Sequence, residues 1–131
     1  QNLSANDKQI FDKLKKIYSE AKLEIPTLEN VLLGAISGTK STKDQARKIF
    51  QLLLDSGEII KVTNDFYFTQ IAINELIGKL KIYAGKTSDR LIDVPTFKDL
   101  AGISRKYAIP LVEYFDQQKI TRRAGDKRLI L

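Results

Sequence analysis

Residues 42–69, TKDQARKIFQLLLDSGEIIKVTNDFYFT, contain first a helical and then a strand-like pattern of apolar residues. Apolar residues in the first half of this stretch recur at the spacing of an amphipathic helix, at Ala46, Ile49, Phe50 and Leu53. Ser56-Gly57 ends this pattern, and beyond it the apolar residues alternate as they do in strands. The stretch therefore predicts a helix followed by a β-hairpin, whose strands, residues 58–62 and 66–69, are joined through Asn64-Asp65.

Two more helices are predicted before this stretch. Residues 4–21 carry apolar side chains at helical spacing, and Ser4 with Asp7 resembles a capping box at their start. Pro26-Thr27 opens a second helical pattern, which ends at Ser37-Gly38-Thr39. Three helices followed by a hairpin is the order of a winged helix, in which the hairpin forms the wing.

The same order of elements recurs in the second half of the chain. The predicted helices cover residues 71–84, residues 95–101 and a segment that begins at Ser104. The predicted hairpin pairs residues 120–123 with 128–131. Shifting one half by 61 residues places Ile59 on Ile120 and Asp65 on Asp126, which is typical of a tandem repeat. Pro110 is expected to bend or loosen the last helix. The predicted fold class is mainly α with small β-hairpins (α+β), in two tandem winged-helix modules, residues 1–69 and 70–131.

Composition excludes several classes of chemistry. The 131 residues include no Cys and no His, which removes disulfides, Cys/His metal sites, thiol nucleophiles and imidazole acids or bases. Asp and Glu are scattered singly along helical patterns, where a solvated surface explains them better than carboxylate catalysis does. We therefore expect a chain that is not an enzyme and needs no cofactor.

The ends and the hydropathy of the chain give three further expectations. No apolar run approaches the ~20 residues of a membrane-spanning helix, and no signal-peptide pattern is present, so a soluble chain without membrane contact is expected. The sequence starts at Gln1 and contains no Met, which suggests a piece of a longer protein whose catalytic part would lie elsewhere. No dimerisation element is visible, and we expect a monomer.

The net charge of +6 is divided unevenly between the predicted modules. Residues 1–69 carry ten Lys/Arg and nine Asp/Glu, whereas residues 70–131 carry twelve and seven, giving +1 and +5. Between residues 104 and 131 the basic side chains are Arg105, Lys106, Lys119, Arg122, Arg123, Lys127 and Arg128. Such charges can merely solubilise a surface. Here two separate segments that the fold brings to one side share the same sign, which favours nucleic-acid binding.

The last predicted helix, the recognition helix of the second module, begins with two of these cations. Arg105 and Lys106 lie in its first turn, where free backbone N–H groups and the helix dipole favour a phosphate. The other five cations line the wing, and the planar fork of Arg suits phosphates and base edges. Tyr107 can stack on a base or pack under the wing, of which packing is favoured, and Tyr114 is expected in the core. The corresponding surface of the first module is nearly neutral and is interpreted as a spacer or docking face.

Three strings in the second module carry a family resemblance: SRKY at 104–107, EYFD at 113–116 and TRRAGDKR at 121–128. Together with LIDV at 91–94 they closely resemble the C-terminal end of the bacterial selenocysteine-specific translation elongation factor, SelB. The first module resembles the preceding winged helix of that family more weakly, through LDSG at 54–57 and DFYF at 65–68. The resemblance covers the whole chain, and its specificity lies beyond residue 90.

The resemblance implies the last two of four winged-helix modules, without the GTPase domains that carry selenocysteinyl-tRNA. In that family the terminal module binds the selenocysteine-insertion (SECIS) stem-loop of the mRNA and recognises a loop guanine and a bulged uridine. This binding holds the factor beside the ribosome. The implied partners are an mRNA stem-loop and, through the parent factor, the ribosome and selenocysteinyl-tRNA, in the cytoplasm. Transferred by position, the implied RNA-binding residues are Ser104, Arg105, Lys106, Tyr107, Arg122, Arg123, Lys127 and Arg128.

Two other functions stay open on the residues alone. A helix-turn-helix DNA-binding regulator would insert the same third helix into the major groove of DNA, although one neutral and one basic module fit two equivalent half-sites poorly. A protein-interaction module would suit the neutral first module but not the basic second one. For RNA, the deep and narrow major groove of an A-form duplex excludes a helix, so such a module would bind phosphates and splayed loop or bulge bases.

Overall fold

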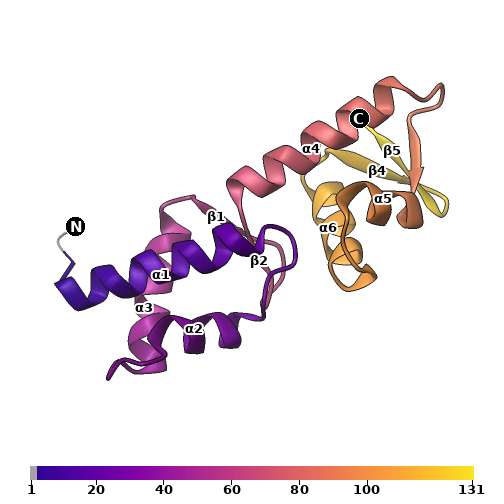
Figure 1. The fold of residues 1–131 in the computed structure, drawn as a ribbon. Helices are drawn as coiled ribbons and strands as arrows, with labels where there is room; N and C mark the ends of the chain where they lie inside the picture. Colours follow the sequence, from indigo (N-terminus) through magenta and orange to yellow (C-terminus); the bar gives the residue numbers. More distant parts are fainter. Residues whose placement is uncertain (1–2) are drawn as a thin grey trace. The chain divides into compact units, whose positions relative to one another are not determined.

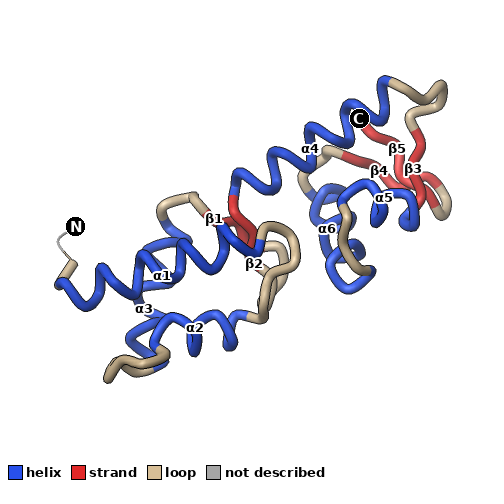
Figure 2. Tube along the Cα trace, in the orientation of Figure 1, coloured by secondary structure: helices blue, strands red, loops and turns tan. Residues whose placement is uncertain are grey.

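The computed structural model describes residues 3–131 and contains six helices and five short strands over that range (Figure 1). The chain divides after Gln70 into two compact units, the second of which is Ile71–Leu131. Each unit has its own helices and small antiparallel sheet, as Figure 2 shows, and each has its own buried apolar residues. The separate roles predicted for residues 1–69 and 70–131 stay predictions.

Three helices and a hairpin make up the first unit: α1 (Ala5–Ala21), α2 (Leu28–Ile36), α3 (Lys43–Asp55), β1 (Ile59–Lys61) and β2 (Tyr67–Thr69). Each helix begins where a hydroxyl oxygen accepts a hydrogen bond from the backbone N–H three residues on, at Ser4, Thr27 and Thr42. The hairpin closes the core of this unit, because the Tyr67 ring of β2 packs edge-on against Phe50 of α3 with 4.9 Å between ring centres.

The second unit follows the same plan with one additional strand: α4 (Gln70–Gly85), β3 (Leu91–Asp93), α5 (Val94–Ala101), α6 (Arg105–Gln117), β4 (Thr121–Ala124) and β5 (Lys127–Ile130). The three strands form an antiparallel sheet in the order β3-β5-β4. Gly125 turns the wing with a φ of 67°, a left-handed conformation that glycine adopts without steric strain. Both units therefore have the winged-helix plan, and the described chain is mainly α with small antiparallel sheets.

β3 is absent from the predicted elements. Its three residues are too few to show the alternation of a strand, and its partner β5 lies at the other end of the second unit. Two hydrogen bonds beside the strand help to fix it: the Ile130 N–H donates to the Arg90 carbonyl at 2.9 Å, and Arg90 Nε donates to the Ile130 carbonyl at 2.8 Å. This strand thus forms through a contact that is distant in sequence.

α6 continues through Pro110 over 13 residues, so the expected loosening at this residue does not end the helix. Pro110 has no N–H to donate to the carbonyl of Lys106, and one helical hydrogen bond is lost. The buried side of α6 packs on α5, where the Phe115 ring lies edge-on to Phe97 with 6.2 Å between ring centres. Tertiary packing therefore outweighs one missing backbone donor.

Candidate nucleic-acid interface

The exposed basic residues between 104 and 131 fall on two parts of the second unit. We call Ser104, Arg105, Lys106 and Tyr107, at the start of α6, the helix-start cluster. We call Lys119, Arg122, Arg123 and Lys127, in the wing and the turn that leads into it, the wing cluster. All six cations of these clusters are exposed, whereas Arg128 is buried.

The helix-start cluster presents a hydroxyl and two cations at the positive end of the α6 dipole. Ser104 occupies the N-cap position with extended backbone, at φ −81° and ψ 165°, but its hydroxyl makes no capping hydrogen bond. The caps at Ser4 and Asp93 do make one. Lys106 Nζ lies 5.3 Å from the centre of the half-buried Tyr107 ring, within the range of a cation–π contact. This arrangement suits an incoming phosphate group.

The matching position in the first unit, the start of α3, is occupied by side chains of that unit. The Thr42 hydroxyl accepts from the Gln45 N–H, and the Gln45 side-chain amide donates to Asp7 of α1 at 2.8 Å. Lys43 Nζ lies 2.8 Å from Glu29, and the hydrogen bond from Lys43 lowers the pKa of the Glu29 carboxyl. Internal contacts thus engage these polar groups in the first unit.

Strand register divides the wing cations between the two faces of the sheet. Residues paired across an antiparallel ladder lie on the same face, and neighbours along a strand alternate between faces. Arg123 pairs with Arg128, so these two share one face, while Arg122 and Lys127 lie on the other. Arg123 Nε donates to the Gly125 carbonyl at 3.0 Å, which holds this exposed side chain along the turn. The wing therefore presents exposed cations on both of its faces.

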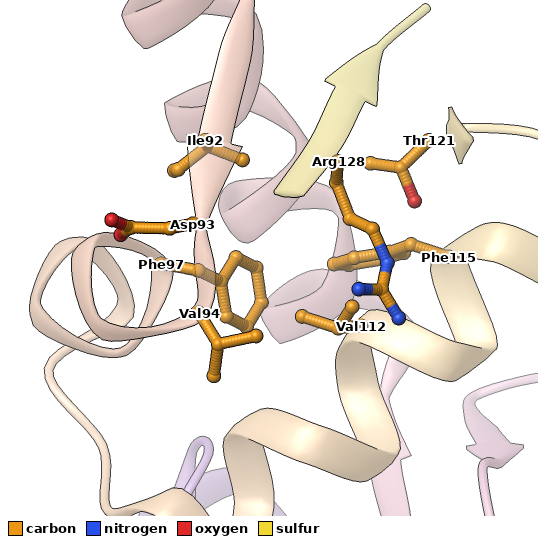
Figure 3. A pocket seen from close by; sticks show the side chains of 8 residues that line it. All are labelled: Ile92, Asp93, Val94, Phe97, Val112, Phe115, Thr121 and Arg128. Atoms are coloured by element: carbon orange, nitrogen blue, oxygen red, sulfur yellow. The ribbon is translucent and has the colours of Figure 1, made fainter. Parts of the chain in front are cut away.

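Arg128 departs from the prediction that it projects from the wing. It pairs with Ile92 of β3 on the face that packs against the helices, and its side chain is only 10% exposed. Figure 3 shows its guanidinium next to Phe115 and Val112, with Phe97 across the small pocket that these residues line. Arg128 Nε lies 3.0 Å from Asp116 Oδ2, so its charge is paired inside the unit. Strand alternation is the physical reason, because one face of this hairpin rests on helices.

A hollow at the base of the wing, here called the basic hollow, is lined by Asp116, Lys119, Thr121, Arg122, Arg123 and Leu131. Three of its lining residues are exposed cations. Lys119 lies in the turn between α6 and β4 with a φ of 61°. The sequence places it among the five wing cations, but it belongs to none of the three strings and is not among the predicted RNA-binding residues. The hollow thus gathers charge from the turn and from β4.

Other kinds of site are not found in residues 3–131. No cluster of His, Cys, Asp or Glu side chains in that range is arranged to hold a metal ion. None of the helices there combines the length and apolar character needed to cross a membrane.

Known proteins resemble this chain in sequence. Residues 86–130 match the model of a family described as "Elongation factor SelB, winged helix". The selenocysteine-specific elongation factor of Desulfomicrobium baculatum is 34% identical over 129 residues, which make up 98% of this chain and 19% of that protein. The chain thus spans about a fifth of the length of this curated relative.

Two solved structures share the fold. The mRNA-binding domain of elongation factor SelB from E. coli, solved in complex with SECIS RNA, matches with a TM-score of 0.72 at 21% identity over 98% of both chains. A bacterial selenocysteine-specific elongation factor, EF-Sec, matches with a TM-score of 0.72 at 23% identity, over 100% of this chain and 20% of that one. The family model and the curated relative agree on the same factor, and the chain is similar in sequence to part of the SelB selenocysteine-specific elongation factors.

Proposed function

We propose that the second unit binds an mRNA stem-loop of the SECIS type, and that the chain thereby attaches a selenocysteine-specific elongation factor to its message. The relative with the same fold, the mRNA-binding domain of E. coli SelB, was solved in complex with SECIS RNA. The observation that carries the proposal for this chain is the placement of its exposed cations. Those between residues 104 and 131 form two clusters on the second unit, whereas the start of α3 in the first unit is engaged by its own side chains.

Each cluster is assigned a role by its chemistry. The helix-start cluster would hold phosphates, because Arg105, Lys106 and the Ser104 hydroxyl surround the end of a helix that attracts anions. Arg122, Arg123 and Lys127 of the wing cluster would contact phosphates and base edges, and the basic hollow adds Lys119 to this set. Arg128 is assigned no direct RNA contact, because its charge is paired with Asp116.

An RNA stem-loop suits this surface better than duplex DNA does. A helix cannot enter the narrow major groove of A-form RNA, so the module would bind the phosphates around a loop or bulge and any bases that are splayed out. A DNA regulator of this fold would insert α6 into a major groove and use two equivalent half-sites. In the second unit exposed cations lie at the start of the recognition helix and along the wing, whereas the start of α3 in the first unit is engaged by its own side chains.

The wider roles belong to the whole factor. We propose that GTP hydrolysis and the binding of selenocysteinyl-tRNA and the ribosome are functions of the parent factor, which would work in the cytoplasm. This chain would contribute binding as a monomer, without catalysis and without a cofactor.

The proposal is tested by titrating the chain with four nucleic acids. The first is a stem-loop RNA with a loop guanine and a bulged uridine, and the second is the same RNA with both features replaced. The third is the DNA version of the stem-loop, and the fourth is a duplex DNA. The proposal predicts that the first RNA binds tightest and that its affinity falls with salt with a log–log slope of about −3 to −5, as for ~4 to 6 phosphate contacts.

Two results would overturn the proposal. Tighter binding to duplex DNA than to any stem-loop would favour the regulator. Undetectable binding to all four nucleic acids would favour a protein partner instead.

A further inference from the structure

One carboxylate connects both strands of the wing to α6. Asp116 lies in the last turn of α6, and its Oδ1 accepts a hydrogen bond from Thr121 Oγ1 at 2.7 Å. Arg128 Nε lies 3.0 Å from Oδ2 and 3.3 Å from Oδ1 of the same carboxylate. Thr121 is the first residue of β4, and Arg128 lies in the central strand β5. We call these three residues the wing clamp.

Stability alone does not account for the wing clamp. A carboxylate in the last turn of a helix faces the negative end of the helix dipole, which disfavours it. The Arg128 side chain is only 10% exposed, so its charge has been removed from water. Its neighbours in the core include Phe97, Val112 and Phe115, among which an apolar side chain would pack well. Replacement of such ion pairs by apolar residues is often neutral or stabilising. The wing clamp is therefore better explained by the orientation that it gives to the wing than by a gain in stability.

The wing clamp also borders the basic hollow. Asp116 and Thr121 line this hollow together with the cations Lys119, Arg122 and Arg123. The Lys119 N–H donates to the Asp116 carbonyl at 3.2 Å, and Arg123 lies directly opposite Arg128 in the sheet. The backbone positions of these exposed cations are therefore tied to the clamp. A change in the clamp would move the cations without removing any of their charge.

We propose that Asp116, Thr121 and Arg128 are positioning residues, which hold the wing cluster in the orientation that RNA requires without contacting the RNA themselves. This inference rests on the proposed function. Groups that recognise a ligand must be held to within ~0.5 Å by the residues that support them. One carboxylate that accepts hydrogen bonds from both strands provides such a support.

The test compares clamp variants with a surface variant in the full chain. Thr121→Val keeps the shape of the side chain and removes one clamp hydrogen bond, and Arg128→Gln removes the ion pair. Arg122→Gln is the matched control, because it removes an exposed cation from the neighbouring position of the same strand as Thr121. The probe is the stem-loop RNA with the loop guanine and bulged uridine. Its affinity is measured over a series of salt concentrations, and circular dichroism checks that each variant is folded at the temperature used.

The clamp variants and the control are expected to differ in salt dependence. Arg128→Gln should weaken binding about tenfold and Thr121→Val about threefold, which are losses typical of residues coupled in one hydrogen-bond network. The log–log salt slope of both variants should stay unchanged. Arg122→Gln should reduce the magnitude of the slope by about one, since one phosphate contact is lost. A second measurement combines Asp116→Asn with Arg128→Gln. The double variant should bind no more weakly than Arg128→Gln alone, because both changes remove the same contact.

Three outcomes would overturn the positioning role. The first is a reduction of the salt slope by Arg128→Gln as large as that by Arg122→Gln, which would make Arg128 a phosphate contact. The second is wild-type affinity in both folded clamp variants. The third is additive losses for Asp116→Asn and Arg128→Gln. Failure of the proposed function gives a different result, because the unmodified chain would then not bind the stem-loop.

Discussion

At the scale of single residues, burial separates side chains that can meet a ligand from those that hold the fold. Arg122 and Arg128 are both wing arginines in the same charged string, yet Arg122 is exposed, whereas Arg128 is buried and paired with Asp116. Residue type alone cannot distinguish them. The difference arises from strand register, which places alternate residues on opposite faces of the sheet.

The helix-start cluster gives the first prediction at this scale. Replacing Arg105 or Lys106 by Ala should weaken binding to every stem-loop RNA alike and reduce the magnitude of the salt slope by about one, because each cation would contact a phosphate rather than a base. Titrations of the cognate and altered stem-loops over a series of salt concentrations measure both effects. A loss confined to the cognate stem-loop would instead assign base recognition to this cluster.

A second prediction concerns Tyr18 in the core of the first unit. Its side chain is fully buried, and its hydroxyl has no hydrogen-bond partner among the described residues. Burial raises the pKa of this phenol well above its usual range, so the hydroxyl stays neutral. Tyr18→Phe removes an unsatisfied buried group, and we expect the free energy of unfolding to stay constant or rise by up to ~1 kcal/mol. Chemical denaturation measures this, and a loss above ~1 kcal/mol would mean that the hydroxyl has a partner.

At the scale of elements, the sequence predicts those helices and hairpins that depend on residues close together in the chain. The three helices of each unit and both hairpins follow from apolar spacing, caps and turn residues, as at Thr42, Gly57 and Gly125. β3 could not be predicted, because it forms only by pairing with β5. The burial of Arg128 could not be predicted either, since it requires knowing which face of the wing rests on the helices. Both differences depend on contacts between residues distant in sequence.

The start of α5 yields a prediction about pH. Asp93 caps this helix, and hydrogen bonds from the Thr96 side chain and backbone lower the pKa of its carboxyl. Because the folded pKa is lowered, this carboxylate stabilises the fold fully above its ordinary pKa of about 4, and the contribution is lost as the pH falls through the lowered value. Asp93→Asn keeps a capping oxygen but does not titrate.

The pH prediction is checked by following the melting temperature between neutral pH and about pH 2, a range that includes the titration of Asp. The melting temperature of the wild-type chain should fall further across this range than that of Asp93→Asn. Identical acid dependence of the two proteins would show that Asp93 contributes nothing to it.

The wing gives a prediction about specificity. Arg122, Arg123 and Lys127 are carried by a hairpin that is held to α6, so at least one of them should recognise a base. Its replacement by Ala should cost ~1 to 3 kcal/mol with the cognate stem-loop, and much less with a stem-loop whose loop guanine or bulge is changed. Equal losses on both RNAs for all three variants would show that the wing supplies only charge. Recognition would then have to come from Ser104 and Tyr107.

At the scale of the whole molecule, two units with the same fold have surfaces that differ in charge. Both units have the winged-helix plan, but residues 1–69 carry a net +1 and residues 70–131 carry +5. The start of α3 is engaged by Asp7 and Glu29, whereas the start of α6 presents exposed cations. The repeat is visible in the sequence, and so is the uneven charge. The internal contacts that occupy the first surface become visible only in the structure.

The proposed function places the RNA affinity in the second unit, and removing charge from either unit tests this. Two variants of the full chain are titrated with the cognate stem-loop RNA. One carries Lys119→Gln, Arg122→Gln and Arg123→Gln in the second unit, and the other carries the same change at three exposed lysines of the first unit, Lys16, Lys48 and Lys61. Both lose the same charge. The second-unit variant should bind at least ~100-fold more weakly, with a salt slope smaller by about two to three, while the first-unit variant stays within ~3-fold of the wild-type chain. Equal losses in the two variants, or a larger loss in the first-unit variant, would contradict the account.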